Sequence, residues 1–418
     1  MKRCWLCRAG LLLLLLSAAL WLYWPALYRP AIADSVLPMS PAQIERGAYL
    51  ARAGNCIACH TQPGAPEYSG GRRIATPFGD VYSSNLTPDV DTGLGAWRAA
   101  DFYRALHEGR SRDGRLLTPA FPYPNYTRIT RADSDALLAY LRTLPPVRRA
   151  PRAAELRFPY NTSLALQLWR RLYFRPAEFA ADAQRSASWN RGAYLVDGLG
   201  HCNACHARRD WLGGVRDSRA YAGGEIAGLD WEALPLTREP PLDDAQAGEW
   251  LALLSSGVSQ RHAVSGPMAE VVFHSLQYLH REDLAAMIEY LRSLPGEAQT
   301  PKPDRINARL LQTLQQRGEQ VYGEHCADCH GEQGEGKPSH YPALAGSRLL
   351  GSPSPANAIR IVLYGGYPPS TAANPMPYGM PPFRPQLRDE DVAAVLTYVR
   401  SAWGNQAGAV LPAQVAKR

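Results

Sequence analysis

The stretch RGAYLVDGLGHCNACH, from Arg191 to His206, is one of three recognisable copies of a segment in this 418-residue chain. The copies end in the pentapeptides CIACH (56–60), CNACH (202–206) and CADCH (326–330). Two thiols three positions apart can add across the two vinyl groups of a haem, and the histidine that follows can then bind the iron. The pattern therefore predicts three sites of covalent haem attachment.

The pentapeptides supply the side chains that such attachment needs. A zinc site would need two cysteine pairs in one tetrahedral set, whereas each pair here has its own histidine. A redox-active disulfide would not require that histidine three times. We therefore predict three covalently bound haem c groups. Their thiols are Cys56 and Cys59, Cys202 and Cys205, and Cys326 and Cys329, and their proximal iron ligands are His60, His206 and His330.

The first 33 residues are typical of an export signal. Basic residues at positions 2, 3 and 8 precede an apolar run, and a small-residue triplet ends at Ala33. This order predicts cleavage between Ala33 and Asp34. The alternative is an uncleaved membrane anchor, because the stretch from Leu6 to Tyr23 is just long enough to span a bilayer. In both cases the haem domains lie outside the cytoplasm.

The net charge of +7 at pH 7 gives no reason to expect nucleic acid as a partner. Part of this charge lies in the N-terminal segment, and the propionates of three haems would offset the rest. The arginines are therefore expected to pair with propionates and with partner surfaces.

A helix is predicted to begin after Ser40 and to run toward Cys56. Ser40 is a good N-cap, Pro41 suits the first helical position, and Gln43 completes a capping box. Each copy of the segment also has a glycine eight to ten residues before its first cysteine: Gly47, Gly192 and Gly318. A glycine inside a helix costs about 1 kcal/mol relative to alanine, so its recurrence indicates close helix crossings.

The crossing partners are predicted at the far end of each repeat, in AYLRTLP (139–145), EYLRSLP (289–295) and TYVRSAW (397–403). Each of these helices has an aspartate in its first turn, where the helix dipole favours negative charge. These aspartates are Asp133, Asp283 and Asp391. We expect Tyr140, Tyr290 and Tyr398 to pack over Gly47, Gly192 and Gly318 respectively, instead of simply facing a general core.

The repeats predict an all-α chain of three tandem haem domains, at 40–147, 186–296 and 310–404, after the signal or anchor at 1–33. Residues 148–185 form a linker and residues 405–418 a short tail. Within the linker, Trp169, Leu172, Tyr173 and Phe174 could enter a membrane surface with neighbouring arginines at the headgroups. Alternatively, the segment straps two domains together.

Methionines are the expected sixth ligands of the second and third haems. A thioether opposite the histidine raises the reduction potential of a haem. Met268 in SGPMAEVV suits the second haem and Met380 in YGMPPF the third, with Met376 a less favoured neighbour. Met287 belongs to a predicted helix and is assigned to the core.

The first domain has Phe121, in TPAFPYPNY, at the place equivalent to Met268. Phenylalanine cannot bind iron, so three arrangements remain open. The first haem is five-coordinate and shielded by Phe121, or it is bound by His107, or it is bound by a distant donor such as Met39.

Several segments between residues 40 and 404 resemble the tri-haem cytochrome c subunit of bacterial membrane-bound dehydrogenases. They are RGAYL, WNRGAYLVDGLGHCNACH, NLTPDVDTGLGAW, PAFPYPNY and GPMAEVV. That family serves quinoprotein alcohol dehydrogenase and the flavoprotein gluconate, sorbitol and fructose dehydrogenases. The resemblance implies cytochrome c domains that take electrons from a periplasmic dehydrogenase and pass them to ubiquinone at the cytoplasmic membrane. The family's methionine in the first domain corresponds to Phe121 here.

An electron-transfer subunit is therefore the expected function, with no substrate-converting site of its own. The sequence shows no nucleophilic triad, phosphate loop or dinucleotide fingerprint. The expected partners are a flavoprotein or quinoprotein catalytic subunit, ubiquinone and the membrane surface, at the periplasmic face of the cytoplasmic membrane. Two alternatives are a peroxidase-like enzyme that uses an open first haem and a cytochrome module of a terminal oxidase.

Overall fold

The computed structural model describes residues 17, 32–34, 37, 39–216, 220–296 and 306–418, so the predicted signal or anchor falls almost entirely outside the described residues. In these ranges no helix is both long enough and apolar enough to cross a membrane. The structure is largely helical. Its α-helices are α2 (Pro41–Ala53), α3 (Cys56–His60), α4 (Ala99–Glu108), α5 (Tyr123–Tyr126), α6 (Arg131–Leu141), α7 (Ser163–Tyr173), α8 (Ala187–Ala193), α9 (Asp244–Ser256), α10 (Pro267–His274), α11 (Arg281–Ser293), α12 (Ala308–His325), α13 (Ala327–His330), α14 (Ala356–Tyr364), α15 (Asp389–Ser401) and α16 (Pro412–Val415).

Two small antiparallel sheets accompany the helices and were not predicted. β1 (Arg73–Thr76) pairs with β2 (Gly79–Tyr82), and β2 pairs in turn with β3 (Glu155–Leu156). β4 (Gly224–Ile226) pairs with β5 (Trp231–Ala233). The strands have only two to four residues each, too few for an alternating pattern to stand out in the sequence. β3 lies in the predicted linker, so that segment extends the sheet of the preceding region.

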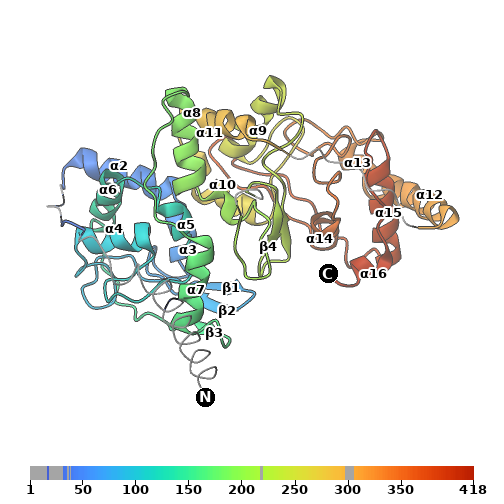
Figure 1. The fold of residues 1–418 in the computed structure, drawn as a ribbon. Helices are drawn as coiled ribbons and strands as arrows, with labels where there is room; N and C mark the ends of the chain where they lie inside the picture. The colour runs from blue at the N-terminus through green and yellow to red at the C-terminus, as the bar shows by residue number, and fades with distance from the viewer. Residues whose placement is uncertain (1–16, 18–31, 35–36, 38, 217–219, 297–305) are drawn as a thin grey trace, which may run out of the picture.

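Three pairs of crossing helices carry the repeated segments: α2 with α6, α8 with α11, and α12 with α15. Figure 1 shows the pairs in chain order along an elongated molecule, from left to right. A Cβ atom on Gly47 would lie 1.9 Å from the carbonyl oxygen of Ala136 and 2.8 Å from Cβ of Tyr140. Gly192 meets Ala286 and Tyr290 in the same way, and Gly318 meets Ala394 and Tyr398. The predicted packing of the tyrosines over the glycines is confirmed.

The N-cap and the first-turn proline of α2 agree with the sequence. Ser40 is the N-cap, its hydroxyl oxygen accepts a hydrogen bond from the Gln43 amide, and Pro41 occupies the first turn. The three aspartates lie in the first turns of α6, α11 and α15 as predicted.

An arginine just before each crossing glycine binds the aspartate of the partner helix. Arg46 Nε lies 2.7 Å from Asp133 Oδ1, and Arg191 Nε lies 2.8 Å from Asp283 Oδ1. The third pair joins Arg317 Nη2 to Asp391 Oδ1 at 2.8 Å. These carboxylates are buried or nearly so, and a buried carboxylate left without its cation would be strongly destabilising. The ion pair is thus a second reason why each helix pair crosses at its glycine.

Two tyrosines connect the first helix pair to the second in a reciprocal manner. The Tyr49 hydroxyl donates to Asp283 Oδ2 at 2.5 Å, and the Tyr194 hydroxyl donates to Asp133 Oδ2 at 2.6 Å. Tyr49 and Tyr194 hold the same position in the RGAYL motif of their copies. Burial raises the pKa of Tyr49 to about 12, and its hydrogen bond to Asp283 contributes to the shift. Each aspartate therefore receives an arginine from its own pair and a tyrosine from the other.

The third copy lacks this tyrosine. Gln320 stands at the equivalent position, where it is exposed and bonds to Arg317 and Glu324 of its own helix. The hydrophobic core follows the same division. One continuous core contains residues from 50 to 141 together with residues from 193 to 291, and a separate core lies between residues 321 and 415.

A π-helical turn at Tyr194–Leu199 absorbs a difference in length between the first two copies. Arg46 and Cys56 are ten residues apart, whereas Arg191 and Cys202 are eleven apart. A π turn accommodates one extra residue without breaking the helix, and such turns are common near functional sites. The arginine and the cysteine consequently keep their places in both copies.

The linker helix α7 lies against both the first and the second regions (Figure 1). Trp169 Nε1 donates to the Leu212 carbonyl at 3.0 Å, and the Tyr173 hydroxyl donates to Asp210 at 2.7 Å. On the other side, Arg170 donates to the Glu108 carbonyl at 2.6 Å. The strap interpretation of this segment agrees with these contacts. Trp169, Tyr173 and Phe174 face the protein instead of solvent, because the first two bond to it and Phe174 is buried.

Candidate haem-binding sites

The histidines of the three CxxCH segments are held in the same way. The Nδ1 atom of His60 lies 2.7 Å from the Ser84 carbonyl oxygen, that of His206 lies 2.7 Å from the Leu234 carbonyl oxygen, and that of His330 lies 2.9 Å from the Pro342 carbonyl oxygen. A carbonyl can only accept, so Nδ1 carries the proton and the lone pair is on Nε2. Each ring therefore has the tautomer and the fixed orientation that a metal-binding imidazole needs.

Burial also favours the form of these histidines that binds metal. It lowers the pKa of His60, His206 and His330, while the bond to the carbonyl oxygen raises it to a smaller extent. A lowered pKa keeps the imidazole neutral at physiological pH, and only the neutral ring offers a lone pair to iron.

All six cysteines of the pentapeptides are free thiols. In each pair the first cysteine is partly buried and the second is exposed. Burial raises the pKa of Cys56 and Cys202 to about 12 and that of Cys326 to about 11. Asn55 and His201, directly before the first cysteine in two of the copies, adopt the left-handed conformation that turns the chain between the helix and the CxxCH segment.

These residues fit covalently attached haem c. Each site has two thiols and one neutral imidazole, the groups that form two thioether bonds and one axial bond to iron. Within the described ranges, no three His, Cys, Asp or Glu side chains gather as ligands of a single metal ion. The cysteine pairs therefore do not converge into a zinc site.

The predicted distal residues differ in their surroundings. Met268 lies in the first turn of α10, partly buried against the large core, and Met380 is partly buried and exchanges two backbone hydrogen bonds with Gly366. Met376 is 83% exposed, which disfavours it as a ligand, and Met287 is 3% exposed, as expected for a core residue.

The first site has no methionine at the equivalent place. Phe121 packs against the large core with its ring 5.3 Å from that of Tyr126. His107 stacks on Tyr103 and lies 2.8 Å through Nδ1 from the Thr127 carbonyl oxygen. Met39 is 48% exposed. His107 thus lies in the predicted helix, with a backbone partner for one of its two ring nitrogens.

Two tyrosines near Cys202 share the carboxylate of Asp197, which the sequence did not reveal as part of the site. The Tyr221 and Tyr290 hydroxyls both donate to it. Burial raises the pKa of Tyr221 well above its usual value, and the negative charge of Asp197 adds to the effect. At the equivalent position the first copy has Arg52, which lies over the ring of Tyr278 at 4.3 Å. The first two sites therefore differ in the sign of a nearby charge.

The first two CxxCH segments adjoin each other. Asn125 donates through Nδ2 to Asn203 Oδ1 at 2.8 Å and to the Asp197 carbonyl at 2.7 Å. The Gly54 carbonyl accepts from the Tyr126 hydroxyl at 3.2 Å and from His201 Nε2 at 3.4 Å. Such proximity of two haem sites is what electron transfer between them requires.

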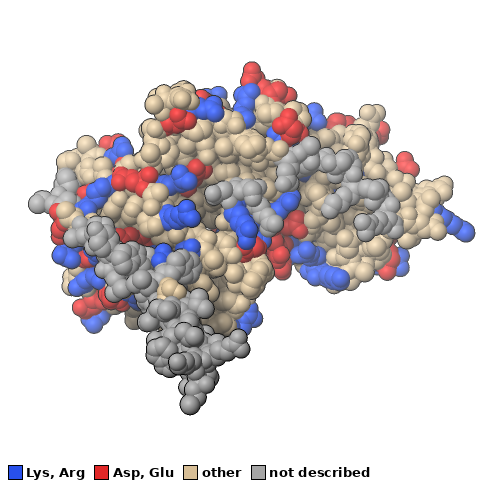
Figure 2. Space-filling view, viewed as in Figure 1, with Lys and Arg blue, Asp and Glu red and all other residues tan. Residues whose placement is uncertain are grey.

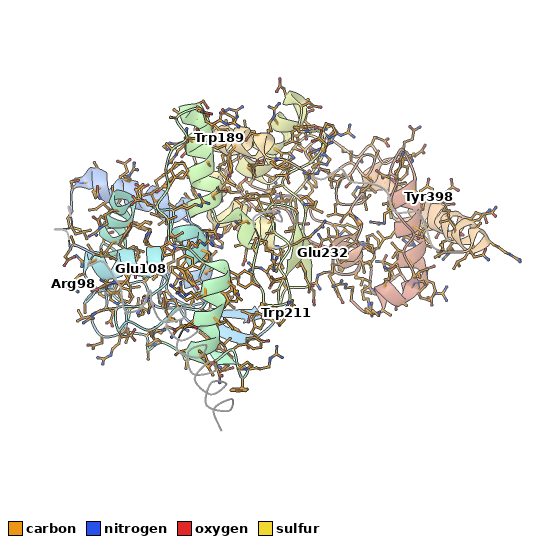
Figure 3. All side chains as sticks on the ribbon, viewed as in Figure 1. Arg98, Glu108, Trp189, Trp211, Glu232 and Tyr398 are labelled. Atoms are coloured by element: carbon orange, nitrogen blue, oxygen red, sulfur yellow. The ribbon has the colours of Figure 1, made fainter. Side chains whose placement is uncertain are left out.

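The second and third regions also share an interface. Asn357 of α14 exchanges two hydrogen bonds, at 2.9 and 2.7 Å, with the backbone of Glu232 in β5. Figure 3 labels Glu232 at this boundary. On the face of the molecule seen in Figure 2, acidic and basic side chains are interspersed.

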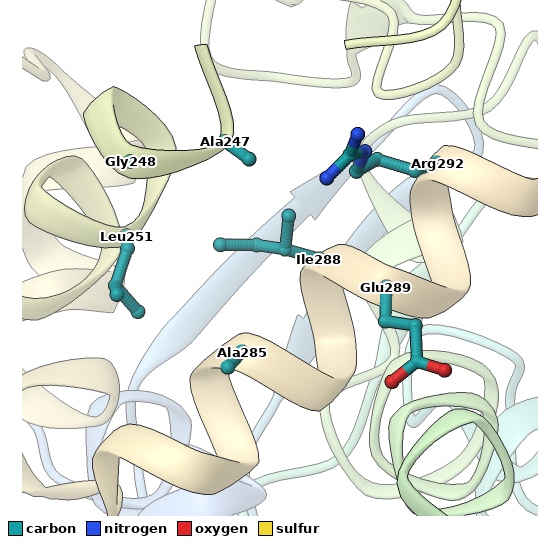
Figure 4. Close-up of a pocket in the computed structure, with 7 residues that line it drawn as sticks. All are labelled: Ala247, Gly248, Leu251, Ala285, Ile288, Glu289 and Arg292. Atoms are coloured by element: carbon teal, nitrogen blue, oxygen red, sulfur yellow. The ribbon is translucent and has the colours of Figure 1, made fainter. Parts of the chain in front are cut away.

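A groove between α9 and α11 is separate from these sites (Figure 4). None of the residues that line it is a predicted haem ligand. They are Ala247, Gly248 and Leu251 of α9 and Ala285, Ile288, Glu289 and Arg292 of α11.

Comparisons with known proteins agree with the geometry. The cytochrome c family model matches residues 44–145 and 315–403. The chain is 40% identical over 387 residues to one of the nicotinate dehydrogenase subunits of Pseudomonas putida, an alignment that covers 90% of this chain and 32% of that protein. It thus spans about a third of the length of that relative.

Two further relatives match over most of both chains. The cytochrome c subunit of alcohol dehydrogenase (quinone) from Gluconacetobacter polyoxogenes is 33% identical, over 92% of this chain and 87% of its own. The gluconate 2-dehydrogenase cytochrome c subunit of Pantoea cypripedii is 34% identical, over 92% and 90%. The chain therefore belongs to the family of dehydrogenase cytochrome c subunits, a family whose members carry electrons through covalently bound haem c.

Proposed function

We propose that this protein is a tri-haem electron-transfer subunit. It takes electrons from a dehydrogenase catalytic subunit, a flavoprotein or quinoprotein, and passes them to ubiquinone at the periplasmic face of the cytoplasmic membrane. The observation that carries the proposal is the threefold recurrence of one arrangement, a cysteine pair followed by a histidine whose Nδ1 is bonded to a backbone carbonyl.

Three tandem cytochrome c domains, at 40–147, 186–296 and 310–404, form part of this proposal. Three helix pairs with the same glycine crossing and the same arginine–aspartate pair support it. The bound haems supply reversible one-electron chemistry, and the protein sets their spacing, axial ligands and surrounding charge. His60, His206 and His330 hold the iron on one side, and Met268 and Met380 complete the second and third sites.

The names of the relatives support a proposal for the donor class. Their catalytic partners are named for alcohol, gluconate, fructose and nicotinate. We propose a dehydrogenase of CH–OH donors, because the relatives named for alcohol and gluconate match over nearly their whole length. A nicotinate-type partner is the competing outcome.

The membrane surface is proposed to contact the outer face of α7. Leu164, Leu168 and Leu172 follow one another at helical spacing and are 57%, 47% and 52% exposed. Phe158 and Trp211, at 81% and 82% exposed, are further apolar side chains at the surface, and Figure 3 labels Trp211. An exposed apolar stripe of this kind is typical of helices that lie in a membrane interface. Cosedimentation of the chain without residues 1–33 with anionic phospholipid vesicles should weaken in Leu168→Ser, but not in the control Leu310→Ser on α12.

The test of the electron-transfer role compares the purified chain with its native complex. The chain alone should oxidise no alcohol, sugar or sugar acid, whereas the complex should reduce a ubiquinone analogue when given the substrate of its catalytic subunit. Substrate oxidation by the isolated chain would overturn the proposal.

Phe121 motivates a second candidate function, a peroxidase-like reaction at an open first haem. An apolar ring at the distal place offers no donor to iron, so a small molecule could occupy the sixth position. Peroxide turnover by the isolated chain, lost when Phe121→Met fills that position, would support this candidate.

A further inference from the structure

The loop that fixes the proximal histidine of the second site is held by an arginine from the third region. Leu234 and Pro235 are neighbours, and the Leu234 carbonyl accepts from His206. The next carbonyl, that of Pro235, accepts from Arg348 Nη2 at 2.6 Å. The guanidinium is therefore one peptide unit away from the group that orients the proximal ring.

The proximal loop of the third site is likewise contacted from the neighbouring region. The Ala343 amide, directly after the acceptor of His330, donates to the Arg261 carbonyl at 2.8 Å. The corresponding loop of the first site is held within its own region, where Asn85 bonds to the Val147 carbonyl at 2.7 Å. The proximal loops of the second and third sites therefore contact a neighbouring region, whereas the proximal loop of the first site bonds to its own region.

Arg348 carries a positive charge into the interface between the second and third regions. It lies over the ring of the buried Trp250 at 5.1 Å, and among the described residues no acidic side chain forms an ion pair with it. Burial lowers the pKa of Arg348 to about 10, and the charge of Arg238 contributes, so the group stays protonated at neutral pH.

We propose that Arg348, a residue of the third region, is a positioning residue for the second haem. It holds the loop that orients His206 and places a positive charge near the iron site. The inference rests on the proposed function, since it requires haem at Cys202 and Cys205. A cation beside the proximal ligand disfavours the ferric state, which carries one more positive charge than the ferrous state. Arg348 therefore raises the reduction potential of the second haem and makes that potential depend on docking of the third region.

The experiment is a redox titration of the full chain and four variants, after mass measurement of the haem-bearing peptides of each. Arg348→Gln should lower the reduction potential of one haem. At a fixed ambient potential, the ferrous-to-ferric ratio of that haem should fall by about threefold to tenfold. A tenfold fall corresponds to about 59 mV for one electron. Arg348→Lys keeps the charge and should restore most of the potential. The affected haem should be the one whose spin state changes in Met268→Ala.

Arg360→Gln is the matched control. Arg360 also joins the third region to the second, over the ring of Trp231, but Asp230 balances its charge at 3.8 Å. Its loss should leave all three potentials unchanged.

Three results would overturn the inference: no shift in Arg348→Gln, an equal shift in Arg360→Gln, or a Lys variant that behaves like the Gln variant. Absence of haem from the Cys202–His206 peptide would instead contradict the proposed function, so the two failures are distinguishable.

Discussion

Met268 and Met380 are single residues on which the proposed coordination of the second and third haems depends. Met268→Ala and Met380→Ala should each convert one low-spin haem to high spin and lower its potential, because a thioether stabilises the ferrous state. Absorption spectra and redox titrations measure both effects. Met376→Ala is the control, since its side chain is 83% exposed. Unchanged spectra in either variant would show that its methionine is not a ligand.

Phe121 makes the first haem different from the other two. Without sulfur ligation, this haem should be the lowest in potential or should bind added carbon monoxide. Phe121→Met restores the donor without adding charge, and it should raise the potential of the first haem and abolish carbon monoxide binding. A wild-type first haem that already titrates as a low-spin histidine–methionine centre would contradict this prediction.

The sequence predicted the cysteines and histidines of the sites but not the atoms that orient them. CxxCH is a local pattern, readable in five residues. The acceptors of His60, His206 and His330 are carbonyls of Ser84, Leu234 and Pro342, at separations of 24, 28 and 12 residues. Every residue type has a carbonyl, so no side chain marks these positions in the sequence.

The helix crossings are the elements that the haem sites share, and α12 offers a controlled test of them. A Cβ on Gly318 would lie 2.1 Å from the Ala394 carbonyl oxygen, whereas nothing lies within 4 Å of a Cβ on Gly323. Gly318→Ala should destabilise the third region by about 1–3 kcal/mol or more, because the backbone must move apart. Gly323→Ala should be neutral or stabilise by up to about 1 kcal/mol. Thermal unfolding measures both, and equal effects would rule out the close crossing.

The helices were predictable because their signals recur three times along the chain. The glycine, the first-turn aspartate and the tyrosine repeat with nearly constant spacing, and their packing agreed with expectation. The arginine before each glycine was visible in the sequence as well, but its partner became clear only from the pairing of the helices. The π turn was not predicted, because a single extra residue between Arg191 and Cys202 does not by itself indicate where the helix widens.

In the whole molecule, the Tyr49 and Tyr194 hydroxyls join the first two regions into one unit. Tyr49→Phe and Tyr194→Phe should each cost about 1–3 kcal/mol, because a carboxylate oxygen with little exposure loses a hydrogen-bond donor. The double variant should also weaken the magnetic interaction between the first two haems. Electron paramagnetic resonance spectra of the oxidised chain measure this interaction. Gln320→Ala removes the equivalent, exposed side chain of the third copy and should change neither quantity. Equal stability of the double variant and the wild type would show that the reciprocal bonds do not hold the regions together.

The number of haems attached to the chain tests the central claim most directly. The chain, exported in cells with intact haem attachment and then denatured, should have a mass that exceeds its polypeptide by three haems. Peptide mapping should place one haem each on Cys56/Cys59, Cys202/Cys205 and Cys326/Cys329. A denatured chain that carries fewer than three haems would contradict the account.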